Sequence, residues 1–370
     1  MKNNIKDNMK ALLFITGRGL GGDAIIALNI IRALEEKGIQ TEIALDKEAP
    51  GLVFEKNGYN WHKVSIPQAG GHAATKIATI NAGFKTITAS FQARKLIKQL
   101  KVDVVVGVIG GGAVVGCIGA KLAKTPAVGI INTPTDTKVC TRLNTCIAFP
   151  EIDLFRSDNI PTNVHKSFYP LSSGVTEGDK YKALENIKEK VKEENVGDFD
   201  ENKPSILFSS GSSLFELMVK AISDASNPEL SNLADKYNLI LVGIPLKDEY
   251  LDLIQTSKII YLGYIDWIRD LYKLIDLAIL TDDGVMIQEA MACELPTIAL
   301  TRVKYGRYHN MAGIFQGAVI ESNIDQLNDK IEETIANLEN IKNKTKEYSE
   351  KILQSNEKIS KIIIDVAKKE

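Results

Sequence analysis

Short apolar runs alternate with amphipathic stretches along the chain, which is the pattern of an α/β protein with parallel strands. In the first half, apolar runs predict buried strands at residues 11–16, 41–45, 102–107 and 127–131. Two amphipathic stretches, 23–37 and 91–100, predict helices, and Gly38 is placed to end the first of them.

The same pattern begins again in the second half, which predicts further strands at residues 206–209, 238–244, 258–262, 277–280 and 296–300. A turn at residues 211–213 and a helix over 214–223 are expected after the first of these strands. We therefore predict two Rossmann-like α/β domains, residues 1–165 and 166–347. The amphipathic segment from about 348 to 370 predicts a closing helix that packs back onto the N-terminal domain.

Composition narrows the class of protein. At 370 residues the chain exceeds the usual size of a single core, and its net charge of −2 gives no basis for nucleic-acid binding. Its four cysteines lie in mostly apolar contexts without CxxC spacing, which predicts buried free thiols in a reducing compartment. No segment is typical of a signal peptide or a membrane span, so we expect a cytoplasmic protein with at most peripheral membrane contact.

A glycine-rich turn follows the first predicted strand and opens a helix. Glycines let the backbone approach a ligand closely, and a helix N-terminus favours an anion. The turn is a candidate phosphate-binding or catalytic site, formed by Gly17, Gly19, Gly21, Gly22 and Asp23. An acid in the first turn of a helix also stabilises the helix dipole, which is the structural alternative for Asp23.

A second glycine turn is predicted after the strand at 102–107, where ligands bind in open α/β sheets. It consists of Gly110, Gly111 and Gly112. Gly116 and Gly119 have the spacing expected for close packing of a helix on a strand. Packing explains the triple glycine less readily, so it is a second candidate site.

Two motifs of the second half have the chemistry of a nucleotide site. The first is Ser210-Gly211-Ser212-Ser213, whose hydroxyl and backbone N–H groups at a helix start can cradle a diphosphate; one serine alone can also serve as a helix cap. In the second, Glu289 can accept both hydroxyls of a ribose; the alternative is a solvated helix acid. The candidates in the second motif are Asp283, Gly284, Val285, Met286 and Glu289.

Together, these four motifs and their order resemble the MurG family of glycosyltransferases, which are family 28 enzymes of the GT-B fold. The similarity covers most of the chain and is clearest over residues 92–128 and 282–296. The resemblance implies two Rossmann-like domains that face each other across a central cleft. It also implies transfer of N-acetylglucosamine from a UDP-sugar to a polyprenyl-phosphate-linked cell-wall precursor.

The resemblance assigns donor contacts by position in the second half. Tyr264 and Ile265 would flank the base, and Glu289 would hold the ribose hydroxyls. The diphosphate and the sugar would be contacted by the serine motif and by the segment 307–310, which contribute Ser212, Ser213, His309 and Asn310.

In the first half, the two glycine turns would face the pyrophosphate of the acceptor, and Asn132 is a further acceptor-binding candidate. The chain departs from the family here. Asp23 stands where the family usually has a histidine, and residues 130–133 replace a His-Glu-Gln-Asn tetrad. These changes predict an acceptor other than bacterial lipid I. They would suit an archaeal relative that acts in a pseudomurein or other glycan pathway.

The chemistry implied by the family is an inverting, metal-independent displacement in which a base takes the proton of the acceptor hydroxyl. Asp23 is our candidate base, and burial would have to raise its pKa; Asp136 is the alternative. No residue cluster in the sequence suits a metal, and no cofactor is expected besides the UDP-sugar substrate.

A membrane-facing segment is also implied at residues 70–92. Its apolar residues have the spacing of one helical face and are bordered by basic residues, with Ile77, Ile80, Phe84, Ile87 and Phe91 on that face. In the family a comparable region meets the lipid surface, so we expect peripheral contact with the inner face of the cell membrane; an ordinary buried helix is the alternative. Two other functions stay open, a UDP-sugar 2-epimerase of the same fold and a non-catalytic member that binds lipid or proteins.

Overall fold

The computed structural model describes residues 9–17, 19, 21–67, 76–150, 154–155, 159–194, 197–256, 258–281, 285–301 and 310–369, with only the backbone described for 76–84. The chain forms two compact units, Met1–Leu171 with Gln354–Glu370, and Ser172–Leu353. The boundary follows Leu171 and not residue 165 as expected, because residues 166–171 still belong to the first unit. The Tyr169 ring, for example, packs on Phe149 with centroids 4.5 Å apart.

A seven-stranded parallel sheet forms the centre of the first unit, with strand order β3-β2-β1-β4-β5-β6-β7. The strands are β1 (Lys10–Ile15), β2 (Gln40–Asp46), β3 (His62–Val64), β4 (Val104–Val108), β5 (Ala127–Ile131), β6 (Thr145–Ala148) and β7 (Val164–Lys166). The helices are α1 (Gly22–Glu35), α2 (Leu52–Lys56), α3 (Lys76–Leu100), α4 (Gly110–Ala123), α5 (Pro134–Cys140) and α15 (Ser355–Ala367).

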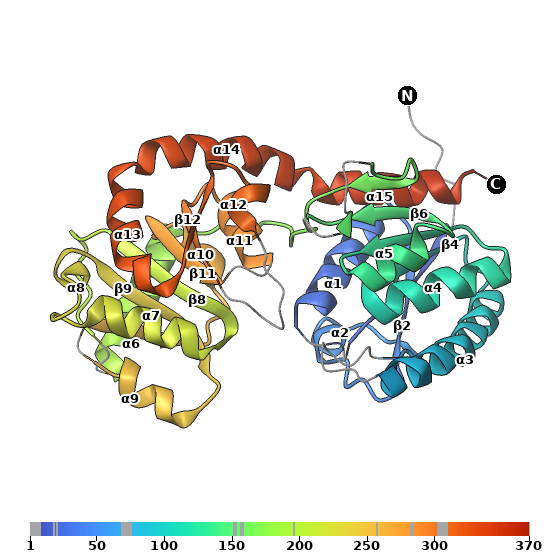
Figure 1. Cartoon of the computed structure of the whole chain (residues 1–370), viewed down its shortest axis with the longest axis horizontal. Helices are drawn as coiled ribbons and strands as arrows, with labels where there is room; N and C mark the ends of the chain where they lie inside the picture. The colour runs from blue at the N-terminus through green and yellow to red at the C-terminus, as the bar shows by residue number, and fades with distance from the viewer. Residues whose placement is uncertain are drawn as a thin grey trace. The chain divides into compact units, whose positions relative to one another are not determined.

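Helices cover this sheet in layers, as Figure 1 shows. Helix α3 lies along α4, while α15 packs against α1 and the strands β4 and β5. Strands β4 and β5 are buried along their whole length, which explains why they are continuous apolar runs in the sequence. One side of the core contains Leu12 and Phe14 of β1 packed with Ala93 and Ile97 of α3.

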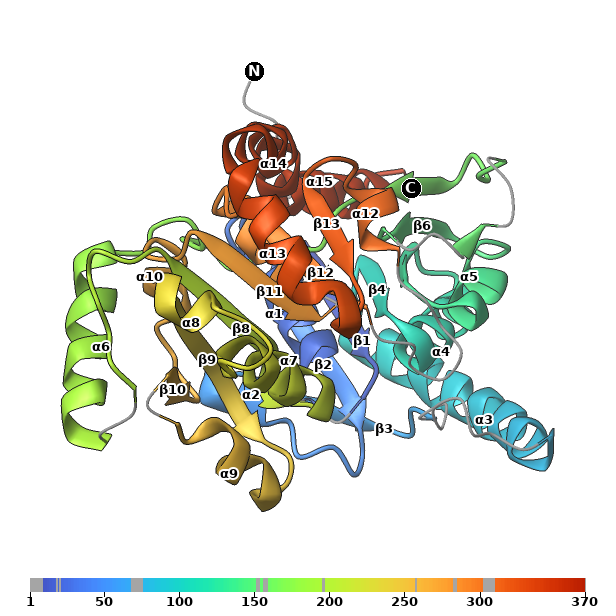
Figure 2. The ribbon, with the colours of Figure 1, turned by 60° about the vertical axis from the view of Figure 1, so that its left-hand side comes forward.

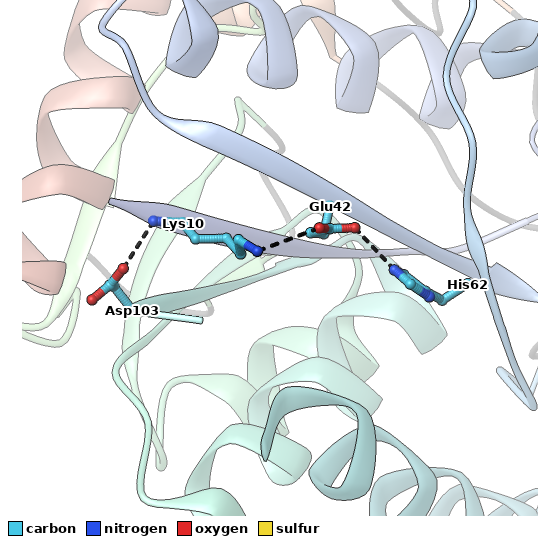
Figure 3. Close-up of polar contacts among 4 residues, drawn as sticks. All are labelled: Lys10, Glu42, His62 and Asp103. Carbon is cyan, nitrogen blue, oxygen red and sulfur yellow. Dashed lines mark hydrogen bonds and ion pairs between the residues drawn. The ribbon is translucent and has the colours of Figure 1, made fainter. Parts of the chain in front are cut away.

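Polar side chains near the amino-terminal ends of these strands form a chain of contacts (Figure 3). The Lys10 backbone N–H donates to Asp103 at 2.9 Å, and the Lys10 ammonium lies 3.7 Å from the Glu42 carboxylate. The other Glu42 oxygen is 2.9 Å from Nε2 of His62. The contacts link β1, β2 and β3 near the edge opposite the carboxyl ends, so we assign them a structural role.

The second unit is built on a six-stranded parallel sheet with strand order β10-β9-β8-β11-β12-β13. The strands are β8 (Ser205–Leu214), β9 (Asn238–Pro245), β10 (Ile259–Gly263), β11 (Leu277–Thr281), β12 (Thr297–Leu300) and β13 (Val319–Ser322). The helices are α6 (Lys180–Glu194), α7 (Glu216–Ser226), α8 (Leu233–Lys236), η2 (Asp248–Tyr250), α9 (Leu251–Ile254), α10 (Ile268–Tyr272), α11 (Val285–Ala292), α12 (Met311–Ile314), η3 (Ile324–Gln326), α13 (Leu327–Ala336) and α14 (Leu338–Leu353).

One core of the second unit lies between the sheet and helices α7, α8, α9 and α13. Figure 2 shows α7, α8 and α9 together over one side of strands β8 and β9. Helix α11 packs against α14, and α10 against α6. Every strand of the sheet except β13 is mostly or fully buried, as the apolar runs of the sequence predict.

Two helices differ from the sequence expectation. Helix α3 begins at Lys76 rather than at residue 91, so it joins the helix expected at 91–100 to most of the segment 70–92, whose apolar spacing indicated one helical face. The helix expected from about 348 to 370 is divided, because α14 ends at Leu353 and α15 begins at Ser355, but the expected packing onto the N-terminal domain is confirmed for α15. The break coincides with the passage of the chain from the second unit to the first, so only α15 packs with the N-terminal sheet.

Candidate active site

Each sheet has one position where the strand order reverses, between β1 and β4 in the first unit and between β8 and β11 in the second. Ligands of open α/β proteins bind at the carboxyl ends of strands at such positions. The two predicted glycine turns follow β1 and β4, the serine motif lies at the end of β8, and α11 follows β11. Each of these two edges is therefore a candidate site.

Asp23 lies in the first turn of α1, half-buried at the edge of the first sheet. A Cβ atom added at Gly17 would lie 4.0 Å from the Oδ2 atom of Asp23, so the Asp23 carboxyl group lies beside the glycine turn. Burial raises the pKa of Asp23, and the negative charge of Asp136 raises it further. Within the described part of the chain, no hydrogen bond engages its carboxylate. This combination gives a more basic carboxylate, neither of whose oxygens is bound by a described residue.

Asp136 is fully buried and holds two loops together through their backbones. Its carboxylate accepts hydrogen bonds from the N–H groups of Gly110 at 2.7 Å, Thr133 at 2.9 Å and Asn132 at 3.4 Å. Burial raises the pKa of Asp136, and these backbone donors offset the rise in part. Because both oxygens are engaged, Asp136 is a positioning residue, and its expected alternative role as the base does not fit.

The triple glycine is the first turn of α4 and not a separate loop. A Cβ atom at Gly112 would lie 2.5 Å from the backbone nitrogen of Thr16, and one at Gly111 would lie 2.3 Å from a backbone oxygen of the segment after β3. Close packing therefore explains these glycines, contrary to the expectation from sequence. The N–H of Gly110 is bound to the Asp136 carboxylate, so it does not serve as a donor to the pyrophosphate of an acceptor.

The glycines of the first turn also differ in how closely they are packed. Gly19 is buried, and a Cβ atom there would lie 2.6 Å from the Cα atom of Gly51, so its role is structural rather than acceptor binding. Gly21 and Gly22 are exposed with open space around them at the N-terminus of α1. Among the described residues of the turn, a ligand can therefore reach Gly21 and Gly22, and Gly17 lies beside Asp23.

The serine motif continues strand β8, which corrects the expected turn and helix start. β8 stays paired with β9 beyond the motif, with a shift in register between Ser209 and Ser213, and α7 begins only after Phe215. The Ser210 hydroxyl donates to the Ser213 carbonyl at 2.8 Å and accepts from the Phe215 N–H at 3.1 Å. Ser212 is exposed on this bulge and does not lie at a helix N-terminus.

The β8 bulge lies directly against the start of α11. Gly211 has a φ of 94°, a conformation that favours glycine. A Cβ atom at Gly243 on β9 would lie 2.8 Å from the Gly211 carbonyl oxygen, so two glycines shape this bulge. The Met286 sulfur is 3.9 Å from the Ser209 hydroxyl. The structure thus brings the serine motif and the residues that open α11 together at one edge.

Glu289 is half-buried on α11, and burial raises its pKa to about 7. Tyr264 follows β10 at the same edge of the sheet and is 62% exposed, whereas Ile265 is half-buried. Asn310 caps α12 by accepting a hydrogen bond from the Gly313 N–H at 2.6 Å. The remaining donor candidates lie outside the described residues: Asp283, Gly284 and His309.

The connection between Asp136 and the two loops is the main feature that our sequence reasoning missed. Thr133, Pro134 and Asp136 form a capping box with proline at the first helical position. This spacing is visible in the sequence and would have identified Asp136 as a cap. Its contact with Gly110, far away along the chain, leaves no sequence signal.

Over the residues that the structure describes, no group of three or more His, Cys, Asp and Glu side chains could hold a metal ion. Among the same residues, no helix is long and apolar enough to cross a membrane.

Comparison with known proteins agrees with this architecture. Residues 13–128 match the glycosyltransferase family 28 N-terminal domain, and residues 191–352 match the glycosyl transferases group 1. Over 301 residues the chain is 27% identical to a UDP-N-acetylglucosamine–N-acetylmuramyl-(pentapeptide) pyrophosphoryl-undecaprenol N-acetylglucosamine transferase of Clostridium botulinum, with 78% of each chain covered. MurG of Acinetobacter baumannii has a similar structure (TM-score 0.65, 16% identity, 96% of this chain and 99% of that chain), as does a glycosyltransferase of Rickettsia africae (0.65, 15%, 98% and 100%).

Two parallel-sheet Rossmann-like units, together with these two domain matches, define the protein as a glycosyltransferase of the GT-B fold. Within this class it is a MurG-like glycosyltransferase with a family 28 N-terminal domain. The fold class and the family predicted from the sequence motifs are thereby confirmed.

Proposed function

We propose that the protein transfers N-acetylglucosamine from UDP-N-acetylglucosamine to a polyprenyl-phosphate-linked glycan precursor. The similarity to the Clostridium botulinum transferase over 78% of both chains supports this donor and this class of acceptor. The observation that carries the mechanism is Asp23, a half-buried carboxylate of raised pKa at the strand-order reversal of the first sheet. A carboxylate in this state is suited to take a proton from a sugar hydroxyl near neutral pH.

In the proposed reaction, the Asp23 carboxylate removes the proton of the acceptor hydroxyl while that oxygen attacks the anomeric carbon of the donor sugar. The bond between this carbon and the diphosphate oxygen breaks, UDP departs, and the anomeric configuration is inverted. The charge that develops on UDP is stabilised by hydrogen-bond donors of the protein and not by a metal. Asp136 assists by keeping a negative charge near Asp23, which raises its pKa.

On the acceptor side, Asn132 is a suitable contact. Its Oδ1 atom is buried and accepts no hydrogen bond from a described residue, although its backbone N–H is held by Asp136. An acceptor hydroxyl or amide N–H would satisfy this oxygen. The exposed N-terminus of α1 at Gly21 and Gly22 is the part of the glycine turn that can receive the acceptor's pyrophosphate.

On the donor side, Glu289 holds the ribose hydroxyls, and Ser212 and Ser213 contact the diphosphate. Tyr264 and Ile265 flank the base. Four of these residues lie at the carboxyl-terminal ends of β8 and β10, and Glu289 lies on α11, the helix that follows β11, which supports these roles. Six further residues remain proposed contacts to the donor: Asp283, Gly284, Val285, Met286, His309 and Asn310.

The test of the mechanism is Asp23→Asn, compared with Asp365→Asn, which changes an exposed acid on α15 of the same unit. Transfer from labelled UDP-N-acetylglucosamine to a lipid-linked acceptor should fall by about 100-fold or more in Asp23→Asn, because general-base catalysis contributes about that much. Donor affinity by calorimetry should stay within about twofold of wild type. Near-normal transfer by Asp23→Asn would remove Asp23 from the mechanism.

Three further measurements separate this function from its alternatives. Transfer that persists in excess EDTA supports the metal-independent reaction. Conversion of UDP-N-acetylglucosamine to its 2-epimer without any acceptor would indicate the epimerase instead. A protein that gives no thermal shift with any nucleotide sugar would be a non-catalytic family member.

We also propose peripheral contact with the cytoplasmic face of the membrane through α3. Ile87 and Phe91, one helical turn apart, are 57% and 54% exposed, and Lys85, Arg94 and Lys95 are exposed around them. The buried-helix alternative is therefore wrong for Ile87 and Phe91; the side chains of Ile77, Ile80 and Phe84 lie outside the described residues. Ile87→Ser with Phe91→Ser should weaken sedimentation with anionic liposomes, whereas equal sedimentation of the variant and wild type would contradict membrane contact.

A further inference from the structure

A groove with a volume of about 510 Å³ lies in the second unit, at the amino-terminal ends of β11 and β12. Its walls come from the α10–β11 connection, the α11–β12 connection and helix α14. The proposed donor residues of β8 and of the segment after β10 lie at the opposite, carboxyl-terminal edge of the sheet, whereas Glu289 lies between the two edges on α11. The volume is within the range of small-molecule sites, which is about 300–1,000 Å³.

Tyr272 lines this groove and contains an unsatisfied polar atom. The side chain is 3% exposed, and its hydroxyl is buried without a hydrogen-bond partner among the described residues. Burial raises the pKa of Tyr272 well above its usual value, and the nearby acidic groups of Glu289 and Cys293 raise it further, so the hydroxyl keeps its proton and can donate it to an acceptor. A buried hydroxyl without a partner is costly, and a bound oxygen acceptor would offset this cost.

Two lysines supply positive charge at the same groove. Lys273 comes from the end of α10 and Lys342 from α14, and neither forms an ion pair with a described residue. The groove also contains acids, but one oxygen of Asp276 already accepts the Ser205 N–H at 2.8 Å, which leaves Glu294 as the one acid there without a described partner.

Two further polar groups of the groove are already used within the protein. The Ser349 hydroxyl donates to the Ala292 carbonyl at 2.8 Å, and the Cys293 thiol donates to the Val175 carbonyl at 3.3 Å. The rest of the lining includes apolar side chains, such as those of Leu295 and Leu338. Three donors, the Tyr272 hydroxyl and the two lysine ammonium groups, therefore lie beside an apolar wall, which is the chemistry that recognises an anion with an apolar body.

We propose that this groove is a second ligand site, separate from the nucleotide-sugar site, and that it binds a small organic anion with an apolar body. The Tyr272 hydroxyl and the ammonium groups of Lys273 and Lys342 bind the anionic group, and the apolar wall receives the body. The site does not depend on the proposed transferase reaction, because none of these residues takes part in it.

The experiment uses the fluorescent anion anilinonaphthalene sulfonate as the probe, titrated into the full chain with saturating UDP-N-acetylglucosamine present. We expect saturable binding that the nucleotide sugar does not displace. Its Kd should rise about tenfold in Lys273→Ala with Lys342→Ala, and about threefold or more in Tyr272→Phe, since hydrogen bonds to charged groups are worth at least that much. Lys346→Ala, an exposed lysine of α14 outside the groove, is the matched control and should bind as wild type.

Complete displacement of the dye by UDP-N-acetylglucosamine would overturn the proposal, as would equal affinity of all these variants. Tyr272→Phe keeps the ring that fills the core, and thermal unfolding reports whether it folds. The lysine variant changes only exposed side chains, so it tests the site even if Tyr272→Phe is unstable. A crystal structure in which an ordered water satisfies the Tyr272 hydroxyl while the dye binds elsewhere would also refute it.

Discussion

The raised pKa of Glu289 makes donor binding depend on pH within an accessible window. Burial raises this pKa from 4.5 to about 7. If the carboxylate holds the ribose hydroxyls as proposed, only its ionised form accepts both hydrogen bonds. A group with a pKa of 7 is ionised in about one molecule in eleven at pH 6 and about ten in eleven at pH 8. We therefore expect the Kd of UDP-N-acetylglucosamine to fall about tenfold from pH 6 to pH 8.

The same pKa shift acts in the opposite direction on folding. A carboxyl group with a raised pKa in the folded state destabilises that state increasingly as the pH rises from the unfolded to the folded pKa. For Glu289 the interval from 4.5 to about 7 corresponds to about 3 kcal/mol, fully present above pH 7. Glu289→Gln should therefore raise the Tm at pH 8 by several degrees, and most of this gain should disappear near pH 4.5.

Calorimetric titration with UDP-N-acetylglucosamine measures the binding part. This ligand is preferable to UDP because its pyrophosphate is a diester and has no ionisation near pH 6, unlike a terminal phosphate. Glu289→Gln should bind the donor about tenfold or more weakly than wild type at pH 8 and show no pH dependence from 6 to 8. Glu350→Gln, an exposed acid on α14, should behave as wild type. A wild-type Kd that is flat across this range, or a Glu289→Gln variant with unchanged affinity, would refute the assignment.

Three other predictions concern the residues that shape the two edges. Gly112→Ala should lower the free energy of unfolding by about 1–3 kcal/mol in denaturant titrations, because the new Cβ atom would overlap the backbone at Thr16. Gly22→Ala places its Cβ atom in open space and should leave the free energy of unfolding unchanged. Asp136→Asn should destabilise the protein by about 2–4 kcal/mol through lost backbone hydrogen bonds. It should also move the acidic limb of the profile of transfer rate against pH to lower pH, because it removes the charge that raises the pKa of Asp23. Ser210→Ala should cost about 1 kcal/mol of folding stability, whereas Ser212→Ala should leave stability unchanged and weaken donor binding.

The sheet strands were the part of the fold that the sequence predicted best. The predicted strand at 127–131 has the bounds of β5, and those at 238–244 and 277–280 differ from β9 and β11 by one residue at one end. Strands of a doubly covered parallel sheet are buried on both faces, so each appears as an uninterrupted apolar run. This signal is local, and it needs no knowledge of what the strand packs against.

The errors arose where a long-range contact decides the local structure. The SSGSS segment has a typical turn composition, yet it extends β8 because Gly211 and Gly243 let the two backbones approach and Ser210 bridges the bulge. Gly111 and Gly112 resemble a ligand loop in the sequence, but they allow close approach of the segments after β3 and β1. Sequence patterns record composition and period, and these contacts depend on partners elsewhere in the chain.

The charges at the two edges support the proposal that the first unit binds the acceptor and the second binds the donor nucleotide. At the first edge, the N-terminus of α4 is neutralised by the Asp136 carboxylate, and Asp23 adds a second acid nearby. Two carboxyl groups, one of which raises the pKa of the other, suit a neutral hydroxyl that must lose a proton. At the second edge Glu289 is a carboxylate that a ribose can satisfy and a phosphate cannot. The first unit is thus suited to deprotonate an acceptor, and the second to hold a nucleoside.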